Sequence, residues 1–289
     1  MGLGLLGRVS AIVRGRRGLP KRARGLPRQK ELIYEFFGGS GRALLLILDA
    51  CRLDYLERHL GLLGGLRSYI VEGPRAVLSS GSYTREWLER TFDRPLKDVV
   101  YVSANPYVRE FRDRFARVVE LWAFAWDEEL GTVRAGKVSE AVKLVLKRGA
   151  GKVIAHYLQP HAPFVRGSWL NRPFSHRSWG QELFAYELAR RSPDARREFV
   201  RAYDENVRYS LSKVAELASW ALKRYKGMAI AITADHGECL GRWEPLRHFR
   251  KRIWMWLPWL LGLYKEVGHP EGCTYEELLV VPWLVLRQA

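Results

Sequence analysis

The chain has 289 residues, of which 47% are hydrophobic and 12% aromatic, and its formal net charge at pH 7 is +17. This size permits a sizeable core but does not decide between one large α/β domain and two small ones. No uninterrupted apolar run reaches the roughly eighteen residues of a membrane-spanning helix. Three cysteines, at 51, 239 and 273, make no disulfide framework and favour packing roles in a reducing, intracellular setting.

Residues 1–40 are interpreted as a basic N-terminal arm. Nine Arg and Lys residues among the first thirty face no acidic residue. Such a block is typical of an arm attracted to polyanions, so an anionic membrane surface is an expected partner, and nucleic acid is a less favoured one that stays open. The apolar start at 3–13 contains Arg8 and lacks a small-residue cleavage site. We therefore do not expect a secretory signal, and we expect a cytoplasmic location.

In chain order, buried strands are predicted at 41–49, 77–82, 98–103, 152–158, 228–233 and 278–286, with 118–124 as a further candidate. Helical spacing predicts helices at 51–60, 85–92, 133–147 and 199–225. Strands that alternate with helices predict an α/β fold, a three-layer α/β/α sandwich with a mainly parallel central sheet. Residues 41–289 are expected to form this single domain.

Two of the predicted strands end at potential metal ligands. Leu-Leu-Leu-Ile-Leu at 44–48 runs into Asp49, and Ala-Ile-Ala-Ile-Thr-Ala at 229–234 runs into Asp235 and His236. The carboxyl ends of strands are where open α/β folds build their sites. Adjacent Asp and His are ligands that zinc and manganese accept, whereas Asp49 alone is equally well explained as a helix cap. The combination predicts a metalloenzyme, in which Gly237 lets the backbone turn closely around the ion.

Further polar residues lie next to the predicted strands. His161, in Gln-Pro-His-Ala-Pro, and His269, in Gly-His-Pro, are loop histidines at the same predicted end of the sheet. A lone loop histidine is more often exposed than a ligand, but the shared location favours convergence. Arg52 is a candidate oxyanion contact, with a surface helix arginine as the alternative. Asp204 is a weak candidate for the carboxylate of a second metal.

Hydroxyl side chains precede the helix predicted at 85–92. They belong to Ser79, Ser80, Ser82 and Thr84. Free backbone N–H groups and the helix dipole at such a position favour an anionic substrate. A metal-bound hydroxyl there is a nucleophile, and the alternative interpretation is an ordinary helix N-cap.

Together, these motifs resemble those of the alkaline phosphatase/sulfatase superfamily. The resemblance rests on Asp49 after a strand, Thr84 before a helix, and the motifs at 159–163, 233–238 and 268–270. It covers about residues 43–286. It is nearest to archaeal sulfatase-like proteins and to the phosphoethanolamine and phosphoglycerol transferases. The alkaline-phosphatase-like fold is therefore expected.

The resemblance also implies a site with one or two divalent ions, zinc or manganese. The ligands of the first ion would be Asp49, Thr84, Asp235 and His236. Thr84 would be the nucleophile because it directly precedes the helix, with Ser82 as the alternative nucleophile or a substrate contact. His269 would bind a second ion or the substrate, and His161 would contact the transferred group or the leaving group.

Two departures from the superfamily distinguish phosphoryl from sulfuryl chemistry. Sulfatases share a Cys- or Ser-x-Pro-x-Arg stretch, whose first residue becomes formylglycine, and no such stretch occurs in this chain. Sulfatases also place paired acids after the first strand, whereas Asp49 is followed by Ala50. Both differences favour phosphate esters as substrates.

Residues 242–264 form a Trp- and Arg-rich insert between the two ligand motifs. Clustered Trp beside Arg and Lys is typical of a segment that lies in a membrane interface. Each basic residue near anionic headgroups would add about 1 kcal/mol of binding free energy. A hairpin that packs on the core, or a contact between subunits, is an equally weighted alternative.

The sequence therefore predicts a metal-dependent phosphohydrolase or phosphotransferase with a threonine nucleophile. Its expected substrate is a phosphorylated small molecule, a lipid-linked phosphate or a glycan-linked phosphate. Peripheral attachment to the inner membrane face is an open option. The alternatives are a sulfatase-type hydrolase and a non-catalytic membrane or polyanion binder that retains the fold.

Overall fold

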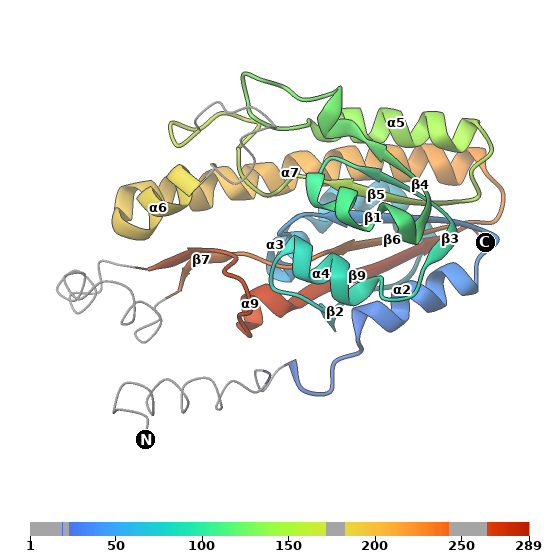
Figure 1. The fold of residues 1–289 in the computed structure, drawn as a ribbon, viewed down its shortest axis with the longest axis horizontal. Coiled ribbons are helices and arrows are strands. Elements are labelled where there is room, and N and C mark those ends of the chain that lie inside the picture. Colours follow the sequence, from blue (N-terminus) through green and yellow to red (C-terminus); the bar gives the residue numbers. More distant parts are fainter. Residues whose placement is uncertain (1–18, 20–22, 172–182, 243–264, 289) are drawn as a thin grey trace.

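The computed structural model describes residues 19, 23–171, 183–242 and 265–288 (Figure 1). Its central sheet has seven strands in the order β2-β9-β6-β1-β5-β3-β4. The strands are β1 (Arg42–Leu48), β2 (Ile70–Leu78), β3 (Leu96–Ser103), β4 (Phe115–Glu120), β5 (Lys152–Tyr157), β6 (Met228–Ala234) and β9 (Val280–Arg287). β9 pairs antiparallel with both neighbours, and the other pairs are parallel. The predicted, mainly parallel sheet is confirmed.

Helices cover both faces of this sheet. The α-helices are α2 (Gln29–Gly38), α3 (Leu53–Arg58), α4 (Thr84–Thr91), α5 (Ala135–Lys147), α6 (Leu183–Arg191), α7 (Pro193–Arg224) and α9 (Glu276–Leu279). Helices α5 and α7 lie together on one face, and α2 and α4 lie on the other (Figure 1). Successive residues of β5 reach these two layers, since His156 packs against Trp87 of α4 and Tyr157 contacts Ser139 of α5. The predicted three-layer α/β/α architecture is confirmed.

Short 3-10 helices join several of these elements. They are η2 (Leu60–Tyr69), η3 (Pro106–Arg114) and η4 (Leu121–Ala123). The segment predicted as a strand at 118–124 is therefore divided between the end of β4 and η4.

The core lies on the central strands. Residues 43–48 of β1 and all of β6 are buried, because neighbouring strands and both helix layers enclose them. On α5, Val138, Val142 and Leu146 are buried at four-residue spacing, which places them on one side of the helix. Because β1 and β6 are parallel and fixed in the core, the residues that follow them lie at the carboxyl edge of the sheet.

Helix α2 lies within the range predicted as a basic arm. Its side chains Ile33, Phe36 and Phe37 join the core, and Gln29 is fully buried. The arm boundary predicted at residue 40 is therefore too late, because the apolar spacing from Ile33 onward forms a core-packed helix. Residues 1–18 and 20–22 lie outside the described residues.

The strand boundaries beside the site also differ from those predicted. β2 ends at Leu78, and residues 79–83 form a loop. Gly81 approaches the backbone of α4 so closely that a Cβ would lie 2.5 Å from Trp87 N. The final strand starts at Val280 because residues 276–279 form α9.

A two-stranded antiparallel sheet follows the Asp-His pair. It consists of β7 (Cys239–Arg242) and β8 (Glu266–Gly268). Residues 243–264, most of the predicted interfacial insert, lie between these strands in the sequence and outside the described residues. Among the described residues, no helix has the length and apolar character needed to cross a bilayer.

Candidate metal centre

Two adjacent parallel strands bring the predicted acids together. In the β1–β6 register Leu48 pairs with Ala234, so the next residues, Asp49 and Asp235, leave the sheet side by side. His236 follows directly. Thr84, the first residue of α4, reaches the same place after the loop at 79–83, in which Ser79 Oγ donates to the carbonyl oxygen of Asp235.

The four predicted ligands of the first ion converge at this edge. Thr84 Oγ1 lies 2.8 Å from Asp235 Oδ2, 3.4 Å from His236 Nε2 and 3.5 Å from Asp49 Oδ2. His236 Nε2 lies 3.5 Å from Asp235 Oδ2 and 3.6 Å from Asp49 Oδ1. Ligands about 2.0–2.1 Å from a tetrahedral ion are separated by about 3.3 Å. The separations that involve Thr84 Oγ1 and His236 Nε2 lie between 2.8 and 3.6 Å, around this value, so the four side chains are candidates for one shared ion.

The charges of this cluster also fit a cation. Asp49 is 1% exposed and Asp235 is fully buried, and Asp49 Oδ1 has no hydrogen-bond partner among the described residues. Burial, and then the charge of Asp235, raises the pKa of Asp49 well above its usual range. For Asp235 burial opposes ionisation, but His236, His156 and backbone N–H groups outweigh it and lower the pKa. Two adjacent buried carboxylates are costly without a positive partner, which a divalent ion supplies.

His236 is oriented as a ligand. Its Nδ1–H donates to the carbonyl oxygen of Gly237 over 2.8 Å, which leaves the lone pair of Nε2 facing the acids. Burial lowers the pKa of His236 to about 4, so the ring is neutral near pH 7. A neutral imidazole is the form that binds a metal.

The backbone after Asp49 is held in an uncommon conformation. Ala50 has a φ of 60°, in the left-handed region that costs a non-glycine residue about 1–2 kcal/mol. Asp235 Oδ1 accepts the Ala50 N–H over 3.0 Å, and Tyr203 donates its hydroxyl to the Ala50 carbonyl over 2.7 Å. These contacts fix the turn that presents Asp49.

Gly237 lies against the backbone of α9. A Cβ at this position would collide with the carbonyl oxygen of Glu277 in α9. The Gly237 N–H also donates to the Leu278 carbonyl over 2.8 Å. The glycine therefore allows close packing of α9 against the Asp-His turn, and its predicted close approach to an ion stays a prediction.

Two polar residues at the site were missed in the sequence. Asn105 Nδ2 donates to Asp49 Oδ2 over 2.8 Å and lies 3.3 Å from Thr84 Oγ1. His156 forms, with Asp49 and Asp235, a buried group whose ligand atoms lie within 4.8 Å of one another. Asn105 comes shortly after the end of β3, as Asp49 comes directly after β1. This position after a strand could have identified Asn105 as a site residue in the sequence.

His161 and His269 lie next to His236. The His269 ring centroid is 4.6 Å from that of His236 and 4.9 Å from that of His161. His161 Nδ1 donates to the Ala162 carbonyl oxygen. The expected convergence of both loop histidines is observed. His161 follows β5, which ends at the carboxyl edge, and the antiparallel direction of β9 returns the segment with His269 to the same edge.

Glu238 supplies the carboxylate beside these histidines. Its Oε1 accepts from His269 Nδ1 over 3.1 Å, and its Oε2 accepts from the Tyr186 hydroxyl over 3.2 Å. Burial raises the pKa of Glu238 to about 7. Asp204, the weak sequence candidate, instead binds Arg58 and His59 near α3.

Ser82 does not face the metal cluster. Its backbone N–H and hydroxyl donate to Glu86 Oε2, over 2.7 Å and 3.1 Å. Its hydroxyl also lies 3.1 Å from the Pro270 carbonyl and accepts the Cys273 N–H over 3.2 Å. This serine ties the start of α4 to the loop after His269.

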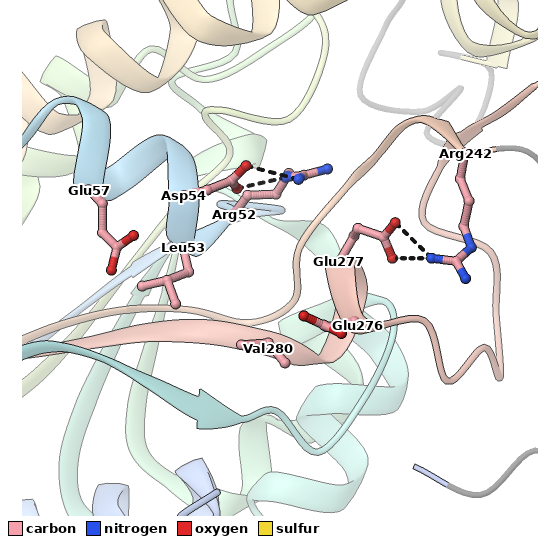
Figure 2. Close-up of a pocket in the computed structure, with 8 residues that line it drawn as sticks. All are labelled: Arg52, Leu53, Asp54, Glu57, Arg242, Glu276, Glu277 and Val280. Carbon is pink, nitrogen blue, oxygen red and sulfur yellow. Dashed lines mark hydrogen bonds and ion pairs between the residues drawn. The ribbon is translucent and has the colours of Figure 1, made fainter. Parts of the chain in front are cut away.

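Arg52 lies in a neighbouring cavity of about 420 Å³. Figure 2 shows its guanidinium directed at Asp54 and, across the cavity, Arg242 directed at Glu277. Arg52 Nη1 also donates to the Glu238 carbonyl over 3.2 Å. These contacts hold Arg52 beside the metal cluster rather than in it, and its contact with a substrate stays a prediction.

No family model matches the sequence, and no curated protein sequence matches it. Solved structures do match. Lipooligosaccharide phosphoethanolamine transferase A from Neisseria meningitidis aligns with a TM-score of 0.55 and 12% identity, over 98% of this chain and 53% of that one. The zinc complex of the C-terminal periplasmic domain of EcEptC from Escherichia coli gives 0.56 and 14%, over 94% and 77%. The fold is that of the alkaline phosphatase/sulfatase superfamily.

A candidate sulfatase from Bacteroides thetaiotaomicron shares this superfamily fold, with a TM-score of 0.51 and 11% identity over 85% of this chain and 64% of that one. The chain spans about half the length of the Neisseria transferase. Identities this low establish the shared fold alone. The superfamily resemblance predicted from the motifs is therefore confirmed in the fold, and the archaeal comparison stays a prediction.

Proposed function

We propose that this protein is a metal-dependent phosphotransferase or phosphohydrolase with Thr84 as its nucleophile. One observation carries the proposal: the Thr84 hydroxyl lies within 3.5 Å of Asp49, Asp235 and His236, in a buried cluster at the carboxyl edge of the sheet. The zinc complex of a superfamily structure supports zinc as the ion, and manganese is the alternative. A bound divalent ion would lower the pKa of the Thr84 hydroxyl and neutralise charge on a phosphate.

Thr84 attacks the phosphorus of the substrate. A bond forms between Thr84 Oγ1 and phosphorus, and the bond from phosphorus to the leaving oxygen breaks. With its hydroxyl pKa lowered by a bound ion, Thr84 would release its proton to water, and the leaving oxygen would take a proton from water. The first product is a phosphothreonine and a free alcohol, and water or an acceptor hydroxyl then displaces Thr84 in a second transfer.

The remaining polar residues assist the leaving and transferred groups. Asn105 donates its amide toward Asp49 and Thr84 and so holds the nucleophile. His161 lies beside His269 and donates its Nδ1–H to the Ala162 carbonyl oxygen, and its proposed role is contact with the transferred group or the leaving group. Glu238 accepts a hydrogen bond from His269 Nδ1 and so orients this ring, whose proposed role is to bind a second ion or the substrate.

A lipid-linked or glycan-linked phosphate is the proposed substrate class. The Neisseria structure is named for a transferase that acts on lipooligosaccharide, and this supports the proposal. The Trp- and Arg-rich segment lies in the sequence between the paired strands β7 and β8, shortly before His269. A membrane-binding segment at this place in the chain would bring a lipid-linked substrate to the site.

The direct test compares turnover of an aryl phosphate, an aryl phosphodiester and an aryl sulfate. The protein is first treated with a chelator and then reloaded with Zn²⁺ or Mn²⁺. We expect metal-restored release of the aryl alcohol from a phosphate substrate, and a peptide with phosphate on Thr84 after acid quenching. Turnover of the sulfate alone would support the sulfatase alternative. No metal-dependent turnover and no stoichiometric metal would support a non-catalytic binder.

A further inference from the structure

His156 is a fully buried histidine next to the metal centre. It lies on β5 and pairs through the backbone with Ile47 of β1 and Ser103 of β3, so its place in the sheet is fixed. Its ring packs against Trp87, at 5.9 Å between centroids, and against Tyr101, at 6.1 Å. A buried imidazole among aromatic rings needs specific partners for both nitrogens.

Tyr101 determines which of these nitrogens carries the proton. The phenol is fully buried, and its oxygen lies 2.9 Å from His156 Nδ1. No other hydrogen bond of this hydroxyl occurs among the described residues. A buried O–H without an acceptor costs about 1–3 kcal/mol, so the phenol donates to Nδ1. Nδ1 is then the acceptor, and Nε2 bears the hydrogen.

Nε2 faces the carboxylate of Asp235. It lies 3.6 Å from Oδ2 and has no hydrogen-bond partner within the described ranges. Asp235 Oδ1 already accepts the backbone N–H groups of Ala50 and His236, over 3.0 Å and 2.8 Å. Oδ2 is therefore the oxygen directed at an ion. This oxygen accepts the Thr84 hydroxyl over 2.8 Å and has a second lone pair that can accept an N–H donor.

We propose that His156 is a positioning residue that donates its Nε2–H to Asp235 Oδ2 and orients this carboxylate toward the ion. Tyr101 fixes the tautomer that makes the donation possible. A protonated nitrogen has no lone pair for a metal, so His156 stays outside the ligand set although it lies within ligand distance of Asp49 and Asp235. This inference rests on the metal centre of the proposed function.

The test measures zinc affinity by competition with a chromogenic chelator. His156→Phe removes the donor, and Tyr101→Phe removes the group that fixes the tautomer. Tyr157→Phe is the matched control, because it deletes a buried hydroxyl on the same strand that contacts Ser139 over 3.1 Å on the opposite sheet face. Loss of an outer hydrogen-bond partner typically weakens metal affinity about 10–100-fold. We expect this loss in both test variants, none in Tyr157→Phe, and partial recovery in His156→Gln.

Co²⁺ absorption distinguishes positioning from ligation. The visible bands of Co²⁺-loaded His156→Phe and Tyr101→Phe should match those of the wild type, since the ligands are the same, whereas Asp235→Asn should alter them. A change in His156→Phe as large as that in Asp235→Asn would overturn the positioning role. Unchanged zinc affinity in Tyr101→Phe would overturn it too, even if His156→Phe does not fold. A wild-type protein without stoichiometric zinc would instead refute the proposed function.

Discussion

Thr84 and Ser82 are separated by one residue, but their hydroxyls have different surroundings. Thr84 Oγ1 lies among two carboxylates and an imidazole, whereas Ser82 Oγ contacts Glu86 and the Pro270 carbonyl. The difference arises because Tyr83 is extended and Thr84 begins α4. The preference for Thr84 over Ser82 as nucleophile therefore rests on position as well as on the motif.

Thr84→Ala should lower the turnover number for an aryl phosphate by about 10³-fold or more, because Thr84 is the proposed nucleophile and the nearby Ser82 hydroxyl is bonded elsewhere. Thr84→Ser should keep part of the activity. Ser82→Ala is the matched control and should keep turnover within several-fold while costing about 1 kcal/mol of unfolding free energy. Equal losses in Thr84→Ala and Ser82→Ala, measured in folded protein, would contradict the nucleophile assignment.

Asp49→Asn tests the electrostatics of the cluster. Asp49 is buried beside Asp235 without a hydrogen-bond partner for Oδ1 among the described residues. Removing its charge should raise the unfolding free energy of the chelator-treated protein by about 1–3 kcal/mol. The same change should abolish the stabilisation that Zn²⁺ gives the wild type. Thermal unfolding with and without Zn²⁺ measures both effects, and an undiminished Zn²⁺ shift in Asp49→Asn would exclude Asp49 as a ligand.

Gln29 of helix α2 supports the strand and the helix that carry the candidate metal centre. Gln29 Nε2 donates to Thr233 Oγ1 and to the Ala234 carbonyl, both over 2.6 Å, and Gln29 Oε1 accepts from Trp87 Nε1 over 2.7 Å. Three elements, α2, β6 and α4, therefore meet at one buried amide. Ala234 directly precedes Asp235, so the same amide supports the strand end that carries the ligands.

Gln29→Leu should destabilise the protein by about 2–4 kcal/mol, because it leaves the buried Trp87 N–H and Ala234 carbonyl without partners. Lys30→Ala, at the next position, removes an exposed ion pair with Asp93 and should cost less than about 1 kcal/mol. Urea unfolding of both variants gives the comparison. Similar midpoints for the two would show that α2 is not part of the cooperative domain.

The candidate metal ligands at 49, 235 and 236 were predictable because their signal is local. An apolar run that ends in Asp49, and another that ends in Asp235 and His236, is visible without knowledge of the fold. Gln29 and His156 act through partners that are distant in the sequence, 204 residues in the case of Gln29 and Thr233. His156 also lies inside strand β5, and a single polar residue within an apolar strand does not indicate a site in the sequence.

The direction of β9 was likewise not predictable. A short apolar strand has the same composition in either direction, and its antiparallel pairing with β2 and β6 depends on the whole sheet. This direction is what brings His269 and α9 to the carboxyl edge. The motifs therefore predicted that His269 lies near His236. The physical cause, the direction of β9, is seen only in the sheet topology.

On the scale of the whole molecule, the net charge of +17 and the Trp-rich segment favour an anionic surface as partner. Trp254/Trp256/Trp259→Ser should reduce flotation with anionic phospholipid vesicles several-fold. Trp169→Ser, which removes an exposed tryptophan outside this segment, is the control and should leave flotation unchanged. Equal flotation of the triple variant and the wild type would exclude the segment as the membrane anchor.

The most direct test is a crystal grown with Zn²⁺ and measured on both sides of the zinc absorption edge. An anomalous peak should lie about 2.0–2.2 Å from ligand atoms of Asp49, Thr84, Asp235 and His236. A peak bound by other residues would contradict a metal centre at the junction of β1, β6 and α4. So would a zinc-saturated crystal with no peak among these four side chains.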